Sequence, residues 1–72
     1  MKHDYQMRED KIYDEEGNIH TVYGVVAIEQ GNIIRSVSDV FKDKTDAEYY
    51  IGLFNSLQLS LCHLDDIIEE IL

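Results

Sequence analysis

The first half of the chain has the hydrophobic pattern of three successive β-strands. Residues 4–13 alternate loosely between apolar and polar side chains, residues 19–29 are rich in β-branched and aromatic side chains, and residues 33–37 form a shorter apolar run. The middle run is apolar on both sides near its centre, as expected for a central strand that is covered on each face. This order predicts a three-stranded antiparallel meander.

Two polar turns that contain glycine separate these runs, one at residues 14–18 and one at residues 30–32. A three-residue loop in the first turn would pair Tyr13 with Ile19, whereas a two-residue loop would pair Tyr13 with His20. The two registers place different side chains on the core face of the sheet. The sequence leaves both registers open.

The second half of the chain predicts a helix after a polar connection at residues 38–44. Thr45 and Glu48 have the spacing of a capping box, in which Thr45 caps the first turn and Glu48 reaches back to it. Helical spacing then predicts a buried stripe, flanked by Ile51 and Leu53. The members of this stripe are Ala47, Tyr50, Phe54 and Leu57.

A second helix is expected after Ser60, which is a suitable N-cap residue. Its apolar face consists of Leu61, Leu64, Ile67, Ile68, Ile71 and Leu72, and its polar face of Cys62, Asp65, Asp66, Glu69 and Glu70. We expect the apolar face to pack on the sheet of the same chain, with a partner chain as the alternative. The predicted fold class is therefore α+β, a single domain over residues 1–72 with a β-β-β-α-α order and both helices on one face.

Two glycines lie inside predicted elements. Gly24 lies in the central strand, where it indicates a β-bulge or a close backbone contact. Gly52 lies in the middle of the first helix, where glycine costs about 1 kcal/mol relative to alanine. We therefore expect a close packing contact at Gly52.

The length and net charge of the chain limit the kinds of molecule that it can bind. The chain has 72 residues, with 6 Lys and Arg against 15 Asp and Glu, which gives a formal net charge of −9. This balance argues against direct binding to nucleic acid or to an anionic membrane, and it permits a basic protein partner. A domain of this size has a small core, so a homodimer is a further expectation. The absence of a signal-peptide pattern and the single cysteine, Cys62, favour a cytoplasmic protein.

The sequence contains no recognisable catalytic or metal-binding motif. His3, His20 and His63 lack the spacing of a metal site, and His63 is badly placed to activate the adjacent Cys62 because neighbouring helical residues point about 100° apart. We expect Cys62 at the edge of the seam between the helices. We predict no enzyme activity, no cofactor and no metal site.

The candidate partner-binding residues are Tyr49, Asp65, Asp66, Glu69 and Glu70. Tyr49 lies off the predicted buried stripe, and tyrosine favours interfaces because it joins apolar area to a hydroxyl group. The four acids share one helix face and can meet a basic partner. The leading hypothesis is a non-catalytic protein–protein interaction or regulatory module. The alternative is an acidic nucleic-acid mimic that inhibits a basic DNA- or RNA-binding protein.

From residue 23 onward, the order of features matches a known pattern. It runs through Tyr23-Gly24-Val25-Val26-Ala27, a turn, a capped helix and finally His63-Leu64-Asp65-Asp66-Ile67-Ile68-Glu69-Glu70-Ile71-Leu72. This order resembles a family of short uncharacterised acidic proteins from clostridial and related Firmicute bacteria, which end in a Leu-x-x-(Val/Ile)-(Val/Ile)-Glu-(Asp/Glu)-hydrophobic-Leu segment. The resemblance implies a bacterial cytoplasmic protein and brings no activity or functional residue with it.

Overall fold

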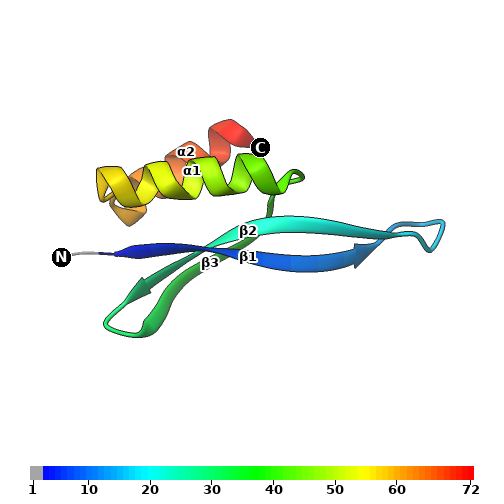
Figure 1. Ribbon diagram of the computed structural model, residues 1–72, viewed down its shortest axis with the longest axis horizontal. Coiled ribbons are helices and arrows are strands. Elements are labelled where there is room, and N and C mark those ends of the chain that lie inside the picture. Colours follow the sequence, from blue (N-terminus) through cyan, green and yellow to red (C-terminus); the bar gives the residue numbers. More distant parts are fainter. Residues whose placement is uncertain (1–2) are drawn as a thin grey trace.

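A computed structural model describes residues 3–72 as one antiparallel sheet followed by two helices (Figure 1). The strands are β1 (Asp4–Tyr13), β2 (Ile19–Glu29) and β3 (Asn32–Phe41), in the spatial order β1-β2-β3, and the helices are α1 (Lys44–Leu57) and α2 (Leu61–Ile71). The α+β meander predicted from the sequence is confirmed.

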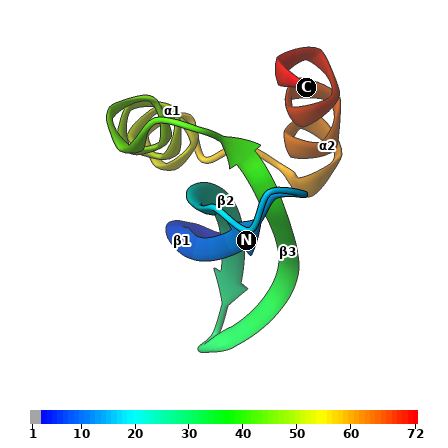
Figure 2. The same cartoon turned by 90° about the vertical axis from the view of Figure 1, so that its right-hand side faces the viewer.

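Both helices lie on the same face of the sheet, as Figures 1 and 2 show. α1 contacts mainly β1 and β2, whereas α2 contacts β3. The hairpin of β1 and β2 extends beyond the helices, which explains the elongated dimensions of 44 × 24 × 19 Å. One face of the sheet is therefore covered over only part of its length.

The β1–β2 hairpin has the register of the three-residue loop, one of the two that the sequence left open. Tyr13 pairs with Ile19, and Met7 pairs with Val25. Gly17 in the turn has a φ of 85°, which favours glycine. The Asp14 side chain accepts hydrogen bonds from the backbone amides of Glu16 and Asn18, at 2.9 and 2.8 Å.

β3 continues to Phe41, so the prediction of a polar connection from Ser38 is wrong. The cause is a bulge, because Val25 pairs with Val37 whereas Tyr23 pairs with Phe41. The extra residues of β3 lie opposite Gly24, and Asp39 among them adopts a φ of 56°. A Cβ atom on Gly24 would lie 2.8 Å from the Cα of Ser38, which confirms the predicted close backbone contact.

α1 begins one residue before the predicted cap. Asp43, not Thr45, is the N-cap residue, and it makes no side-chain cap hydrogen bond. The predicted capping box is wrong because β3 ends at Phe41, so that only two residues connect the sheet to the helix. Thr45 therefore already lies within the first turn.

The buried side of α1 differs from the predicted stripe. The helix buries Ala47, Ile51 and Phe54, while Tyr50 is half-buried and Leu57 is exposed. At 100° per residue, the buried face is centred on these three side chains and Leu57 lies to one side of it. The predicted packing contact at Gly52 is also wrong, because nothing lies within 4 Å of a Cβ placed there.

α2 packs as its amphipathic pattern predicted. The Ser60 hydroxyl accepts a hydrogen bond from the backbone amide of His63 at 3.4 Å, and Leu64 and Ile68 are buried. Cys62 is exposed. The core that joins sheet and helices consists of Tyr5, Val25, Ala27, Val40, Phe41, Ala47, Ile51, Phe54, Leu64 and Ile68.

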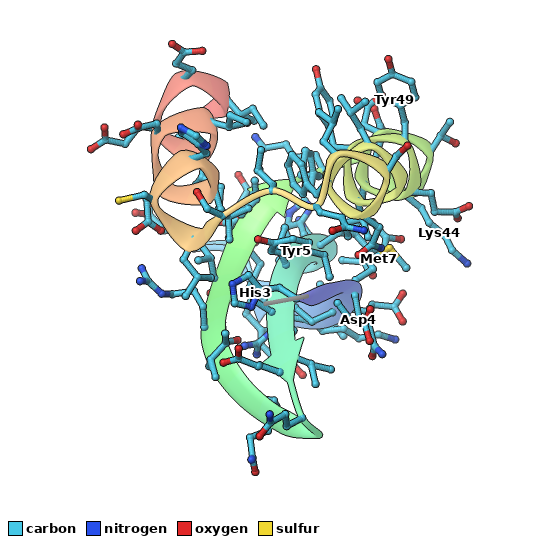
Figure 3. The ribbon with its side chains drawn as sticks, turned by 90° about the vertical axis from the view of Figure 1, so that its left-hand side faces the viewer. His3, Asp4, Tyr5, Met7, Lys44 and Tyr49 are labelled. Atoms are coloured by element: carbon cyan, nitrogen blue, oxygen red, sulfur yellow. The ribbon has the colours of Figure 1, made fainter. Side chains whose placement is uncertain are left out.

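Tyr5 connects β1 to α1 and to the segment between the two helices. Its ring packs edge-to-face against Phe54 at 5.9 Å, and its hydroxyl donates a hydrogen bond to the backbone carbonyl of Leu59 between the helices (Figure 3). The side chain of Asn55 bonds the Tyr5 backbone twice, accepting from the N–H at 2.7 Å and donating to the carbonyl at 2.9 Å. Burial raises the pKa of the Tyr5 hydroxyl. These bonds fix the position of α1 on β1.

Candidate interaction surface

α1 carries a second apolar row that is separate from its buried face. Tyr49, Leu53 and Leu57 recur every four residues, and their exposed fractions are 66%, 38% and 63%. At 100° per residue they lie on the opposite flank of α1 from Asn55, which bonds β1. We call these three residues the α1 row.

Aromatic packing supports one end of the α1 row. The Tyr49 ring meets the Tyr50 ring edge-on at 5.3 Å, and Tyr50 stacks on Phe41 at 5.4 Å with an interplanar angle of 16°. Figure 3 shows Tyr49 on the side of α1 that points away from the sheet. These ring contacts connect Tyr49, through Tyr50, to the end of β3 at Phe41.

The predicted partner-binding residues lie on two different helices. Tyr49 is exposed on α1, whereas the four predicted acids lie on α2. Asp65 is not free, because both of its carboxylate oxygens accept hydrogen bonds from Nη1 of Arg35 at 2.9 Å. This ion pair connects α2 to β3. The exposed acids of α2 are Asp66, Glu69 and Glu70.

The two helices are strongly acidic. They contain six carboxylates against one lysine, Lys44 at the start of α1, and no arginine. Among residues 3–72, Asp65 is the only one of these six that forms an ion pair. The remaining carboxylates of the helical layer are Asp46, Glu48, Asp66, Glu69 and Glu70, and all five side chains are exposed.

The helical pattern predicted Leu57 in the buried stripe and Leu53 beside it, so neither was expected on this surface. The spacing of Tyr49, Leu53 and Leu57 is a detectable signal of a second row. Which of the two apolar rows faces the sheet depends on the contacts of α1 with β1, and the periodicity does not contain that information.

The hairpin end of the molecule has a different chemical character. A surface cavity of about 370 Å³ is lined by Ile12, His20, Thr21, Val22, Asp39 and Lys42. His20 Nε2 lies 2.8 Å from Asp14 Oδ2, and this hydrogen bond, with those from the Asn18 and Glu16 amides, holds the pKa of Asp14 below its usual value. These bonds stabilise the turn.

Within residues 3–72, no three His, Cys, Asp or Glu side chains gather in a group able to hold a metal ion. No helix of this range has both the length and the apolar character needed to cross a membrane.

The fold and this surface together define a small α+β protein whose acidic helical layer carries an exposed apolar row. Comparison of the chain with protein-family models, with curated proteins and with solved structures found no match.

Proposed function

We propose that this protein is a non-catalytic protein–protein interaction module that binds its partner through the α1 row. The observation that carries the proposal is the exposure of Tyr49, Leu53 and Leu57 in a single row on one flank of α1. Covering apolar surface is favourable by about 25 cal/mol per Å². Tyrosine is among the residues that are enriched where proteins meet.

The proposal also includes a cellular setting. We place the protein in a bacterial cytoplasm, on the basis of the resemblance carried by its C-terminal segment and of the single cysteine, Cys62. A regulatory role follows if the bound partner is an enzyme or a DNA-binding protein whose activity changes on binding.

Photo-cross-linking from the α1 row tests the proposal. A benzoylphenylalanine at position 49 preserves an aromatic ring there, and the same residue at Lys11, an exposed position on the protruding hairpin, is the matched control. We expect a discrete protein adduct from position 49 at native expression levels and none from position 11. No adduct at position 49, or equal adducts at both positions, would contradict the proposal.

A nucleic-acid mimic is the second candidate function. The exposed carboxylates of α2, at Asp66, Glu69 and Glu70, favour it. We rank it second because the helical layer also exposes the apolar α1 row, which has no counterpart in a phosphate backbone. Neutralising these three acids to amides would abolish competition with DNA if the protein is a mimic, whereas Leu53→Ser would have the larger effect on an interaction module.

A further inference from the structure

We propose that the partner segment which covers the α1 row is a basic amphipathic helix. Its apolar side chains would pack on Tyr49, Leu53 and Leu57, and its lysines or arginines would lie against the carboxylates of the helical layer. This inference rests on the proposed function and specifies the chemistry of the partner.

The dimensions of the α1 row match a helix. Tyr49 and Leu57 are eight residues apart, so the row is about 12 Å long at 1.5 Å per residue. This length corresponds to two turns of a partner helix with apolar side chains three and four residues apart. A partner helix can lie beside α1 without displacing the core, because Ala47, Ile51 and Phe54 already fill the sheet-facing side.

The charges around the α1 row select a basic partner. Asp46 lies three residues before Tyr49 and seven before Leu53, so it lies on the same flank of α1, at the N-terminal end of the row. The second helix of the same layer, α2, carries the exposed carboxylates Asp66, Glu69 and Glu70. Among residues 3–72 none of these four acids forms an ion pair. Cationic side chains would therefore meet carboxylates that have no competing internal partner.

The same charges disfavour a second copy of this chain as the occupant. A symmetric dimer through the α1 row would bring two helical layers together, each with six carboxylates and one lysine, Lys44. Among residues 3–72, Asp65 is the one of these six that an ion pair neutralises, with Arg35 of β3. Like charges brought together at an interface oppose association.

A titration of the full chain with synthetic helices tests this inference. The probe is a peptide of about four turns, with leucines on one face and lysines elsewhere. One control peptide has the same composition in scrambled order, and a second has glutamate in place of lysine. We expect saturable binding of the probe, with the amide chemical-shift changes concentrated on residues 49–57. Affinity for both control peptides should be at least about tenfold lower.

Matched variants locate the binding on the α1 row. Leu53→Ser and Leu57→Ser should each weaken probe binding about tenfold or more. Ile33→Ser removes an apolar side chain about as exposed as Leu57, at the end of β3 opposite to the one that leads into α1, and should leave the affinity unchanged. A dispersed amide spectrum of each variant shows that it is folded.

Several outcomes would overturn the inference. Equal affinity for the scrambled peptide would mean that charge alone causes binding, and shift changes away from α1 would place the site elsewhere. No saturable binding of the probe would also contradict the inference. A dimer that Leu53→Ser converts to a monomer would show that a second copy covers the α1 row. In that last case, or if position 49 cross-links to a partner without a basic helix, the proposed function stands and this inference fails.

Discussion

Gly52 and Gly24 both lie inside regular elements, but their surroundings differ. Nothing lies within 4 Å of a Cβ at Gly52, which is exposed on α1. We expect Gly52→Ala to raise the free energy of unfolding by about 1 kcal/mol, because alanine restricts the unfolded chain and favours the helix. Urea denaturation measures the change, and an unchanged or lower value would contradict the open surroundings of Gly52.

Gly24 provides the matched substitution. Its added Cβ would meet the backbone of Ser38 at 2.8 Å, and a backbone neighbour cannot move aside as a flexible side chain can. Gly24→Ala should therefore lower the free energy of unfolding, in the opposite direction to Gly52→Ala. The same urea experiment compares the two variants directly.

Asn55 is a second residue whose role depends on a single long-range contact. Its amide group accepts a hydrogen bond from the N–H of Tyr5 and donates one to the carbonyl of Tyr5. Because β1 is an edge strand, these are bonds that a further strand would otherwise make. Asn55→Ala should lower the free energy of unfolding by about 1–3 kcal/mol, because two partly buried backbone groups lose their partner.

The local effect of Asn55→Ala is measured by hydrogen exchange of the Tyr5 amide, which should become faster. Ser56→Ala, an exposed neighbour on the same helix, is the control and should change neither quantity. Unchanged Tyr5 exchange in Asn55→Ala would show that the side-chain bonds do not protect this edge.

At the scale of elements, the β1–β2 turn makes stability depend on pH. Hydrogen bonds from His20 and, to a smaller extent, from the Asn18 amide hold the pKa of Asp14 below its usual value. The Asp14 carboxyl therefore binds a proton less readily in the folded state than in the unfolded state. The resulting stability is present above the ordinary carboxyl pKa and is lost as the pH falls through the lowered pKa. Asp14→Asn removes this titration.

We therefore expect the difference in stability between wild type and Asp14→Asn to shrink as the pH falls from about 6 to about 2. Urea midpoints across this range measure the difference. Glu15→Gln changes a neighbouring exposed acid and should run parallel to wild type. A constant difference for Asp14→Asn over the whole range would contradict the assigned hydrogen bonds.

The elements themselves were largely predictable, because periodicity and turn residues depend only on nearby sequence. The bounds of β1 and β2, the N-cap at Ser60 and the buried face of α2 all followed from that information. The extension of β3 to Phe41 did not, since it depends on the backbone contact with Gly24 across the sheet. The start of α1 likewise depends on where β3 ends.

The candidate surface was predictable only in part. The exposure of Tyr49 followed from its position off the helical stripe. The pairing of Asp65 with Arg35 joins residues thirty positions apart, and a pattern along one helix cannot reveal it. Leu57 was misplaced because α1 has two apolar rows, and tertiary contacts at Tyr5 decide which of them is buried.

At the scale of the whole molecule, charge and apolar exposure are arranged together. All lysines and arginines precede residue 45, so Lys44 at the start of α1 is the one lysine that the helical layer contains, against six carboxylates. The same layer exposes the α1 row. This combination is the physical basis for a basic, amphipathic partner, and it predicts that added salt weakens the complex without abolishing its apolar component.

The central claim is that the α1 row is dispensable for the fold and is therefore available to a partner. The most direct test is the free energy of unfolding of Leu57→Ser, measured by urea denaturation. The account predicts a value within about 0.5 kcal/mol of wild type, because Leu57 is exposed and outside the core. A loss of about 2 kcal/mol or more, as for a buried leucine, would contradict it.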